Sequence, residues 1–460
     1  MDFSVLKKTP LYDAFSDLGK RILLPDGIFY WSGRAKKEAE LIGTIGTAYG
    51  FEKDFVEGGS EEWMACYLED INEYSSLTSD NIVPYASIGG LQEMREFWKD
   101  WIITKSNYDE DKNANKIEFL KNYTAAPLIT SGITNAIYVT CSLLLNEGES
   151  IISPNKRWGN YDNIITRNIG ADIESFDFFN EKKLNIEGLK EAIKTVAKKQ
   201  DKAVLILNFP NNPTGYVPTP REAQELIAGL KEVQGEIEKP IIVLVDDAYE
   251  PYIYSDDVKN TSIFYDLMEL KEDIIPIKLD GISKELFMYG GRIGSITIGL
   301  KEAWTDSDED LENLKSELNN KLEGLNRSSI SNCNRFYQIL TMEMFKEKGT
   351  DQILKHREKI RKLLQARYKK INEEFKKIQD EKISVDPNSG GFFLFANLDP
   401  DKIKAGEFAN HLLEKYKVGV IPIEKPDINI NGIRIAYCSI DLEKIPEFVD
   451  RIRKALEDFD

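Results

Sequence analysis

The sequence contains few of the side chains that most often carry acid–base or metal chemistry. Its 460 residues include two histidines, His356 and His411, and both lie in Lys/Glu-rich segments with a helical pattern. A catalytic triad, a histidine-ligated zinc and a histidine general base are therefore poorly supported. If the chain is an enzyme, another group must carry its protons, and a lysine can do so.

Cysteine usage and charge exclude further classes of protein. Four cysteines stand far apart and show no metal-ligand spacing: Cys66, Cys141, Cys333 and Cys438. We therefore expect reduced thiols and a cytoplasmic protein. The net charge of −18 argues against a nucleic-acid partner, and no basic face points to a membrane surface. The first residues lack the apolar core of a signal peptide, and no apolar run approaches the length of a membrane span.

The pattern of apolar runs predicts an α/β fold. A chain of this length, with 42% apolar residues, fits one large domain and a smaller one. Short apolar runs alternate with helical segments at 127–130, 150–153, 172–176, 203–207, 240–245, 274–279 and 293–298. Continuous apolar runs separated by helices indicate a mostly parallel sheet covered by helices. In such sheets ligands bind beyond the carboxyl ends of the strands.

The remaining segments give coarser expectations. Residues 50–84 read as an irregular insertion with a helix near 61–74, and residues 104–124 as a polar loop or frayed helix end. A long helical region is expected over 331–380, interrupted near Gly349. After it, three short strands at 392–396, 418–423 and 433–437 alternate with helices.

Lys284 is the candidate for covalent attachment of an aldehyde. It lies in the run Gly281-Ile-Ser-Lys-Glu-Leu-Phe-Met-Tyr-Gly-Gly-Arg292, after an apolar strand. An amine condenses with a carbonyl only when neutral, so such a lysine needs its pKa lowered by desolvation or by a nearby cation. Arg292 could supply that positive potential and hold a phosphate. Taken alone, Lys284 reads equally as a surface lysine, and Arg292 as one half of an ion pair.

Two further segments follow predicted strands. Ser131-Gly132-Ile133-Thr134 opens a helix, where free N–H groups favour an anion, although an ordinary helix start would look the same. Trp158 follows the next strand and could stack on a flat ring or simply pack in the core.

Polar residues also follow or end the next two predicted strands. The turn Asn208-Phe-Pro-Asn-Asn212-Pro-Thr-Gly215 is rigid and could direct the Asn212 amide at a ligand, or cap the next helix. Asp246 ends a buried strand, where a carboxylate is costly unless a cation or donor pairs with it. Tyr249 follows it closely and could donate to a phenolate oxygen. A helix N-cap is the alternative for Asp246.

Two arginines in the C-terminal third are candidates for binding carboxylates. Arg434 lies between two isoleucines in a predicted strand, which is unusual without an anionic partner, and a salt bridge within the smaller domain is the alternative. Arg327 precedes Ser331-Asn332.

Taken together, these residues resemble the class I/II aminotransferases among the fold-type I pyridoxal-phosphate enzymes. The resemblance covers roughly residues 84–440. It rests on the order of the following positions: Tyr85, Gly132, Trp158, Asn212-Pro-Thr-Gly, Asp246-x-Ala-Tyr249, Ser-Lys284, Gly-Gly-Arg292-Ile-Gly and Arg434. It implies a large cofactor-binding domain over 84–325 and a smaller α/β domain over 326–460, with 1–83 as an N-terminal arm and part of the smaller domain.

The resemblance also implies roles for individual residues. Lys284 would bind pyridoxal phosphate covalently and move the substrate Cα proton, and Asp246 would keep the pyridine nitrogen protonated. Asn212 and Tyr249 would bind the ring oxygen, and Trp158 would stack on the ring. Gly132, Ile133, Thr134 and Arg292 would hold the phosphate, with Tyr85 reaching that of a neighbouring subunit in a homodimer. The ring would act as the electron sink.

Substrate choice follows less directly from the resemblance. Arg434 would bind the substrate α-carboxylate, next to Asn212 and Trp158. The spacing of Arg327 to Ser331-Asn332 is similar to that in aspartate aminotransferases, where the arginine reaches a distal carboxylate across the dimer. This implies exchange of an amino group between an L-amino acid, such as aspartate, glutamate or an aromatic one, and a 2-oxo acid.

Two alternatives remain open. One is a lyase or decarboxylase that uses the same cofactor, because such enzymes also bind an α-carboxylate. The other is a non-catalytic regulator that senses an effector with this fold. The stretch before Tyr85 shows no helix-turn-helix and no basic cluster, which disfavours the regulator.

Overall fold

A seven-stranded sheet forms the centre of the larger lobe. The computed structural model describes residues 6–8, 12, 14–22, 26–71 and 77–459. The strand order is β4-β12-β11-β10-β9-β5-β6. Among the described strands of this sheet, β12 is antiparallel to both of its neighbours, and the other pairs are parallel. In that order the strands span Leu128–Thr130, Gly294–Ile298, Ile274–Gly281, Ile241–Asp246, Ala203–Asn208, Ser150–Pro154 and Asp172–Phe176. The predicted α/β class with a mostly parallel sheet is confirmed.

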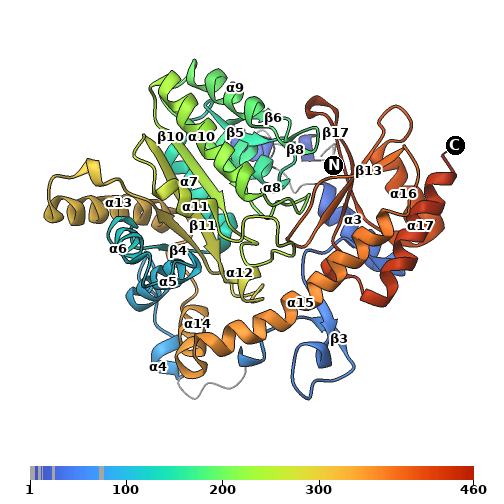
Figure 1. Ribbon diagram of the computed structural model, residues 1–460, viewed down its shortest axis with the longest axis horizontal. Helices are drawn as coiled ribbons and strands as arrows, with labels where there is room; N and C mark the ends of the chain where they lie inside the picture. Colours follow the sequence, from blue (N-terminus) through green and yellow to red (C-terminus); the bar gives the residue numbers. More distant parts are fainter. Residues whose placement is uncertain (1–5, 9–11, 13, 23–25, 72–76, 460) are drawn as a thin grey trace.

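Both faces of this sheet are covered, which explains why its strands read as continuous apolar runs. Alternate residues of a strand point to opposite faces. Leu205 and Val243 join the core that includes α9 (Ile186–Ala197) and α10 (Pro220–Ile237). Val204 and Leu244 join the core that includes α7 (Gly132–Leu144). Figure 1 shows α9 and α10 together at the top of this lobe.

Further helices surround this lobe on the side of the short strand β4. They are α5 (Gln92–Lys105), α6 (Ala114–Tyr123), α13 (Asp308–Ser329) and α14 (Arg335–Lys348), whereas the short α11 (Ile263–Met268) packs on β11 and α10. Two short elements carry residues of the two cavities described below: α12 (Ile282–Glu285), which follows β11 directly, lines the first, and α8 (Asn160–Asp162) lines the second.

A second, smaller lobe is built on a four-stranded antiparallel sheet of order β13-β14-β17-β16. These strands span Ile383–Val385, Leu394–Leu398, Ile430–Ile435 and Ile421–Lys425. Helices α16 (Ala405–Tyr416) and α17 (Ile445–Glu457) pack beside it, and the long α15 (Thr350–Phe375) runs from α14 to this lobe (Figure 1).

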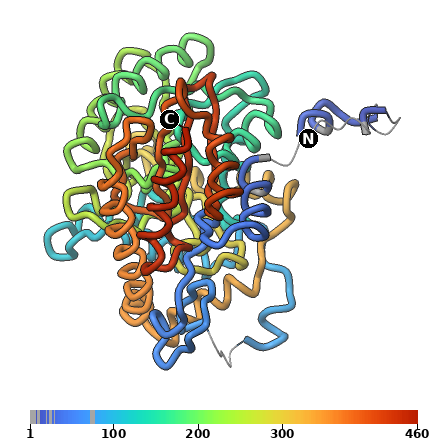
Figure 2. Tube along the Cα trace, turned by 90° about the vertical axis from the view of Figure 1, so that its right-hand side faces the viewer, coloured from blue at the N-terminus to red at the C-terminus, as the bar shows by residue number. Residues whose placement is uncertain are grey.

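The N-terminal part of the chain packs against the smaller lobe. Strand β1 (Leu41–Ile42) pairs in parallel with β15 (Val418–Gly419). Helix α3 (Asp26–Glu38) contacts β15, β16 and α16, and Figure 2 shows it beside the C-terminal elements drawn in red. This packing is consistent with our proposed division, in which residues before 84 contribute to the smaller domain.

Two local predictions were wrong. A helix was expected near residues 61–74. The described part of this segment, which ends at residue 71, instead contains β3 (Trp63–Ala65) and a 3-10 turn (Glu69–Ile71). Strand β3 pairs with β2 (Tyr49–Phe51), and Arg367 lies over the Trp63 ring at 5.2 Å, so contacts distant in sequence override helix propensity.

The second error concerns residues 104–124, expected to form a loop or a frayed helix end. They contain helix α6, which buries Leu120 and places the Phe119 ring near that of Tyr123, one turn along.

None of the helices in the described part of the chain has the length and apolar character that crossing a bilayer requires.

Candidate active site

A cavity of about 320 Å³ lies where strands β9, β10 and β11 reach their carboxyl ends. Side chains from the large sheet, from the N-terminal segment and from the smaller lobe line it together. Nine of the residues selected from the sequence are among them: Ile133, Thr134, Trp158, Asn212, Asp246, Tyr249, Lys284, Arg292 and Arg434. The rule that ligands bind beyond the carboxyl ends of parallel strands therefore located the cavity correctly.

Lys284 projects into this cavity from α12. Its Nζ donates a hydrogen bond to the carbonyl of Gly46 at 2.6 Å and lies 4.8 Å from the centre of the Tyr289 ring. Burial lowers the pKa of Lys284 to about 8; the cationic Arg292 and Arg434 also lower it, and Cys438 opposes them. A substantial fraction of this amine is thus neutral at mildly alkaline pH, as attack on a carbonyl requires.

Asp246 lies at the floor of the cavity, as the last residue of β10. Its carboxylate accepts hydrogen bonds from the Tyr161 hydroxyl and from the backbone N–H of Ala248, the latter at 3.1 Å. Burial raises the pKa of Asp246 to about 6, and the two hydrogen bonds oppose this rise. A bound cation beside this carboxylate would relieve the cost of its burial.

Arg434 enters the cavity from β17 of the smaller lobe. Its guanidinium donates to the Asn212 side-chain oxygen at 3.3 Å and to the Thr44 carbonyl at 3.1 Å, and it lies 4.4 Å from the Phe393 ring centre. Within the described part of the chain, its Nε is buried without a hydrogen-bond partner. Burial lowers the pKa of Arg434 to about 10. A buried arginine with unused donor capacity is suited to binding a carboxylate.

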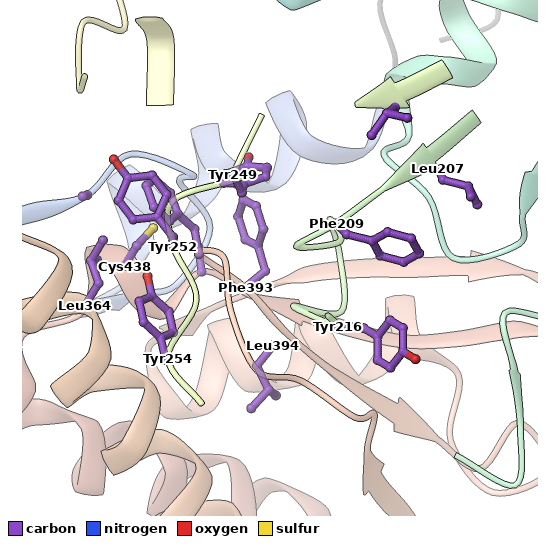
Figure 3. Close-up of a cluster of buried hydrophobic side chains, with 14 of the residues drawn as sticks. Leu207, Phe209, Tyr216, Tyr249, Tyr252, Tyr254, Leu364, Phe393, Leu394 and Cys438 are labelled. Carbon is purple, nitrogen blue, oxygen red and sulfur yellow. The ribbon is translucent and has the colours of Figure 1, made fainter. Parts of the chain in front are cut away.

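Tyr249 and Asn212 lie between Asp246 and Arg434. The Tyr249 ring meets Phe393 edge to face, with centroids 5.7 Å apart (Figure 3). Burial raises the pKa of Tyr249, whereas Arg434 and a hydrogen bond with Asn212 lower it. The turn that carries Asn212 contains two cis peptide bonds, Phe209–Pro210 and Asn212–Pro213.

The end of the cavity next to the start of α7 and Arg292 is suited to an anion. Helix α7 begins at Gly132, so its free N–H groups and its positive dipole end lie there. Gly132 has a φ of +75°, and a Cβ there would lie 2.3 Å from the Arg292 guanidinium. Arg292 has a φ of +56°, in the left-handed region, and donates to the Tyr289 carbonyl at 3.3 Å. Glycine at 132 therefore lets the arginine approach the helix start.

Three of the predicted residues are not among those that line this cavity: Gly132, which opens α7 beside it, Tyr85 and Arg327. Tyr85 is 88% exposed. Arg327 lies in the last turn of α13, where it donates to the Ser331 hydroxyl. Both were expected to act in the site of a neighbouring subunit, and that assignment stays a prediction.

Sequence reasoning missed several residues of the site. Tyr161 follows Trp158 by three residues in the polar stretch Gly-Asn-Tyr-Asp-Asn, where no local signal marks it as the partner of Asp246. Asn208, Ser283 and Tyr289 lie inside the quoted motifs but were not singled out. Gly46, Thr47 and Phe393 reach the cavity from segments in which no site residue was predicted.

A second cavity of about 860 Å³ adjoins the first and shares Thr134, Trp158 and Arg434 with it. Five other cations line it. Three of them are paired with carboxylates: Lys156 with Asp386, and Arg157 and Lys425 with Asp162. The other two, Lys36 and Arg167, have no carboxylate within ion-pair distance among the described residues. Apolar residues, including Ile28 and Ile423, also line this second cavity.

Comparison with known proteins finds similar sequences over most of the chain. Residues 72–452 match the family described as aminotransferase class I and II. The chain is 28% identical to an aspartate aminotransferase of Bacillus sp. (strain YM-2) over 380 residues, which are 80% of this chain and 82% of that protein. It is 25% identical to a probable aspartate/prephenate aminotransferase of Aquifex aeolicus over 383 residues, 81% of this chain and 84% of that protein.

Solved structures show the same fold. An aminotransferase of Anaerococcus prevotii superposes with a TM-score of 0.78 at 24% identity, covering 96% of this chain and 98% of that one. A kynurenine aminotransferase of Pyrococcus horikoshii superposes with a TM-score of 0.74 at 19% identity, covering 98% of this chain and 99% of that one.

Proposed function

The chain belongs to the aminotransferase class I and II family, and we propose that it exchanges an amino group between an L-amino acid and a 2-oxo acid with pyridoxal phosphate at the cavity between the lobes. The observation that carries this proposal is the joint placement of Lys284, Asp246 and Arg434 around one cavity. Members of this family use pyridoxal phosphate, and the two half-reactions alternate on one site in a ping-pong order.

The residues of the cavity fit this cofactor. An aldehyde needs an amine, which Lys284 supplies, and a pyridinium nitrogen needs a carboxylate, which Asp246 supplies at the floor. Tyr249 and Asn212 are donors for a ring oxygen, and Trp158 offers an aromatic face. The start of α7 and Arg292 provide the positive end that a phosphate needs. When bound, the cofactor supplies a ring that accepts the electrons left by the substrate Cα proton.

The chain's own groups have distinct tasks in this scheme. Lys284 would hold the cofactor through its amine and, when free, would carry the proton removed from the substrate Cα. Arg434 binds the α-carboxylate and thereby orients the Cα–H bond toward Lys284. Asp246 would keep the pyridine nitrogen of the cofactor protonated throughout the reaction. The aromatic walls, including Phe393, keep water away from the reacting atoms.

We further propose a homodimer in which Tyr85 and Arg327 complete the partner's site. The high exposure of Tyr85 in one chain supports this, since an exposed tyrosine next to the exposed Val83 is suited to an interface. The lyase, decarboxylase and regulator alternatives are not favoured, because the relatives with printed functions are aminotransferases.

The test is product analysis with the purified enzyme, aspartate and 2-oxoglutarate as the first pair, then a series of donors. Aminotransfer gives glutamate and the 2-oxo acid of the donor in equal amounts. Release of carbon dioxide, ammonia or a side-chain fragment, without formation of glutamate, would instead identify a lyase or a decarboxylase.

Attachment of the cofactor should depend on pH through Lys284. Because its pKa is about 8 instead of 10.5, the fraction of neutral amine rises with pH, reaches its midpoint near pH 8 and levels off about one to two pH units higher. We expect the rate at which cofactor-free enzyme forms its visible absorption band to follow this curve, as measured by stopped-flow mixing with pyridoxal phosphate. A midpoint near 10, the value of an ordinary lysine, would show that the amine is not desolvated.

The second cavity supports an acidic amino donor. Lys36 and Arg167 lack ion-pair partners in the described chain, and aspartate aminotransferases are among the relatives. We therefore propose that a distal carboxylate of the substrate is attracted to these two cations. Arg167→Met should lower kcat/KM for glutamate by about fivefold and leave that for leucine unchanged, as expected for loss of one exposed charge interaction of about 1 kcal/mol.

The control for this comparison is Lys37→Met. Lys37 lies next to Lys36 on α3 but does not line the cavity, so its removal should alter neither substrate. Equal activity of the wild type toward acidic and neutral donors would contradict the proposed preference and leave aminotransfer itself standing.

A further inference from the structure

Directly behind the cavity lies a buried cluster of charges that the reaction does not use. The ammonium of Lys105, the last residue of α5, contacts three carboxylates: Glu250 at 2.9 Å, Asp280 at 3.0 Å and Glu285 at 2.9 Å. All three carboxylates are buried, and oxygens from them lie within 4.8 Å of one another. Such a triad would suit a cation, and the lysine ammonium occupies that position.

The cluster extends beyond Lys105, and nearly all of its charged groups have ion-pair or hydrogen-bond partners. Lys278 pairs with Asp247 and, at 2.9 Å, with Glu250, and its own side chain is fully buried. The indole N–H groups of Trp98 and Trp101 donate to Asp280 at 2.8 Å and to Glu285 at 2.7 Å. Arg357 of α15 is the third cation of the cluster, and it contacts Glu285 at 3.3 Å. Buried charges with this many partners are held in fixed positions.

The carboxylates of this cluster flank the residues of the site along the chain. Glu285 directly follows Lys284, and Asp280 is the penultimate residue of the strand that leads to it. Glu250 directly follows Tyr249. Asp247 directly follows Asp246, and because strand residues alternate, Asp246 faces the cavity while Asp247 faces the cluster. Lys105 therefore joins two separate chain segments, one carrying Asp246 and Tyr249 and the other carrying Lys284.

We propose that Lys105 is a positioning residue for the aminotransfer reaction, whose ammonium fixes the Lys284 segment relative to the Asp246–Tyr249 segment. This proposal rests on the proposed function. It concerns how accurately Lys284 is aimed at the substrate Cα, and it assigns no contact between Lys105 and substrate or cofactor. A shift of either segment by about 1 Å would be enough to lower the rate on the order of 100-fold.

The test compares Lys105→Met with Lys105→Arg in the holoenzyme. Methionine keeps the length of the side chain but leaves three carboxylates without their shared cation, so we expect kcat to fall on the order of 100-fold while KM for the amino donor stays unchanged. Arginine restores the positive charge, and we expect it to recover most of kcat. A merely structural lysine would lower thermal stability without separating kcat from KM.

A second readout does not depend on activity. In the cofactor-free protein, hydrogen exchange of the backbone amides over 279–289 and 246–252 should accelerate in Lys105→Met, while the strand interiors of β5 and β9 keep wild-type protection. If Lys105→Met does not fold, Glu285→Gln serves instead. It keeps one acceptor oxygen, which can still serve Trp101, but replaces the oxygen that accepts from Lys105 with an amide NH2 group. It also removes one charge next to Lys284, and it should lower kcat and raise local exchange to a smaller extent.

The matched control is Lys202→Met. Lys202 is also a partly buried lysine that contacts a carboxylate, Glu149 at 2.8 Å, but it lies at the opposite end of the sheet, where β5 and β9 begin. It should leave kcat, KM and exchange over 279–289 unchanged. Wild-type kcat in Lys105→Met, or uniform acceleration of exchange across the sheet, would overturn the positioning role. Loss of aminotransfer in the wild type would instead overturn the proposed function and leave the exchange result intact.

Discussion

Replacing Lys284 with alanine should abolish aminotransfer, with kcat/KM lowered by on the order of 10⁴-fold or more. Among the described residues that line the cavity, Lys284 supplies the amine that both attaches the cofactor and moves the Cα proton. The visible absorption band of the enzyme–cofactor complex should be lost. Pyridoxal phosphate should still bind, since the start of α7, Arg292, Trp158 and Asp246 remain, and equilibrium dialysis would measure this retained binding.

Lys301 offers a stringent control for this experiment. Burial lowers its pKa to about 8, as it does for Lys284, but its Nζ donates to the carbonyls of Leu267 and Leu270, outside the cavity. Lys301→Met should therefore leave both the visible band and kcat intact. If Lys284→Ala retained the band, the attachment site would be another lysine and the role proposed for Lys284 would be wrong.

The part of the site that could be predicted from the sequence is the part fixed by strand topology. Asp246 ends β10, and Lys284 follows β11, and the two strands are hydrogen-bonded neighbours with Asp246 in register with Leu279. Parallel neighbours bring their carboxyl ends to one edge of the sheet, so residues far apart in sequence meet there without further information. The same rule placed Asn212 correctly after β9.

What could not be predicted depends on contacts between distant segments. Thr44 and Gly46 come from a stretch without recognisable pattern, yet their carbonyls accept hydrogen bonds from Arg434 and Lys284. The charged residues Lys278 and Asp280 stand in a strand that otherwise reads as apolar, and no local pattern indicates that Lys105 meets them. Such pairing is decided by the packing of α5 on the sheet, which the sequence of neither segment encodes alone.

Asp246→Asn should produce the second-largest loss, on the order of 10³-fold in kcat, comparable to removing a group that stabilises charge in a transition state. Asparagine has nearly the same shape and can still accept a hydrogen bond from the N–H of Ala248, so the fold should be kept. It is neutral, however, and cannot hold a proton on the ring nitrogen of the cofactor. Steady-state kinetics together with an unchanged melting temperature would check this expectation.

The neighbouring Tyr161 makes this prediction testable by pH. In the cofactor-free enzyme the carboxyl of Asp246 has a pKa raised to about 6 by burial, and the Tyr161 hydrogen bond opposes that rise. Below this pH the carboxyl is protonated and cannot pair with a pyridinium, so cofactor affinity should fall as the pH drops through about 6. Tyr161→Phe removes the opposing hydrogen bond, so the fall should begin at a higher pH, with affinity above pH 8 close to that of the wild type. Should affinity in both proteins be independent of pH between 5 and 8, Asp246 would not be the group that pairs with the cofactor ring.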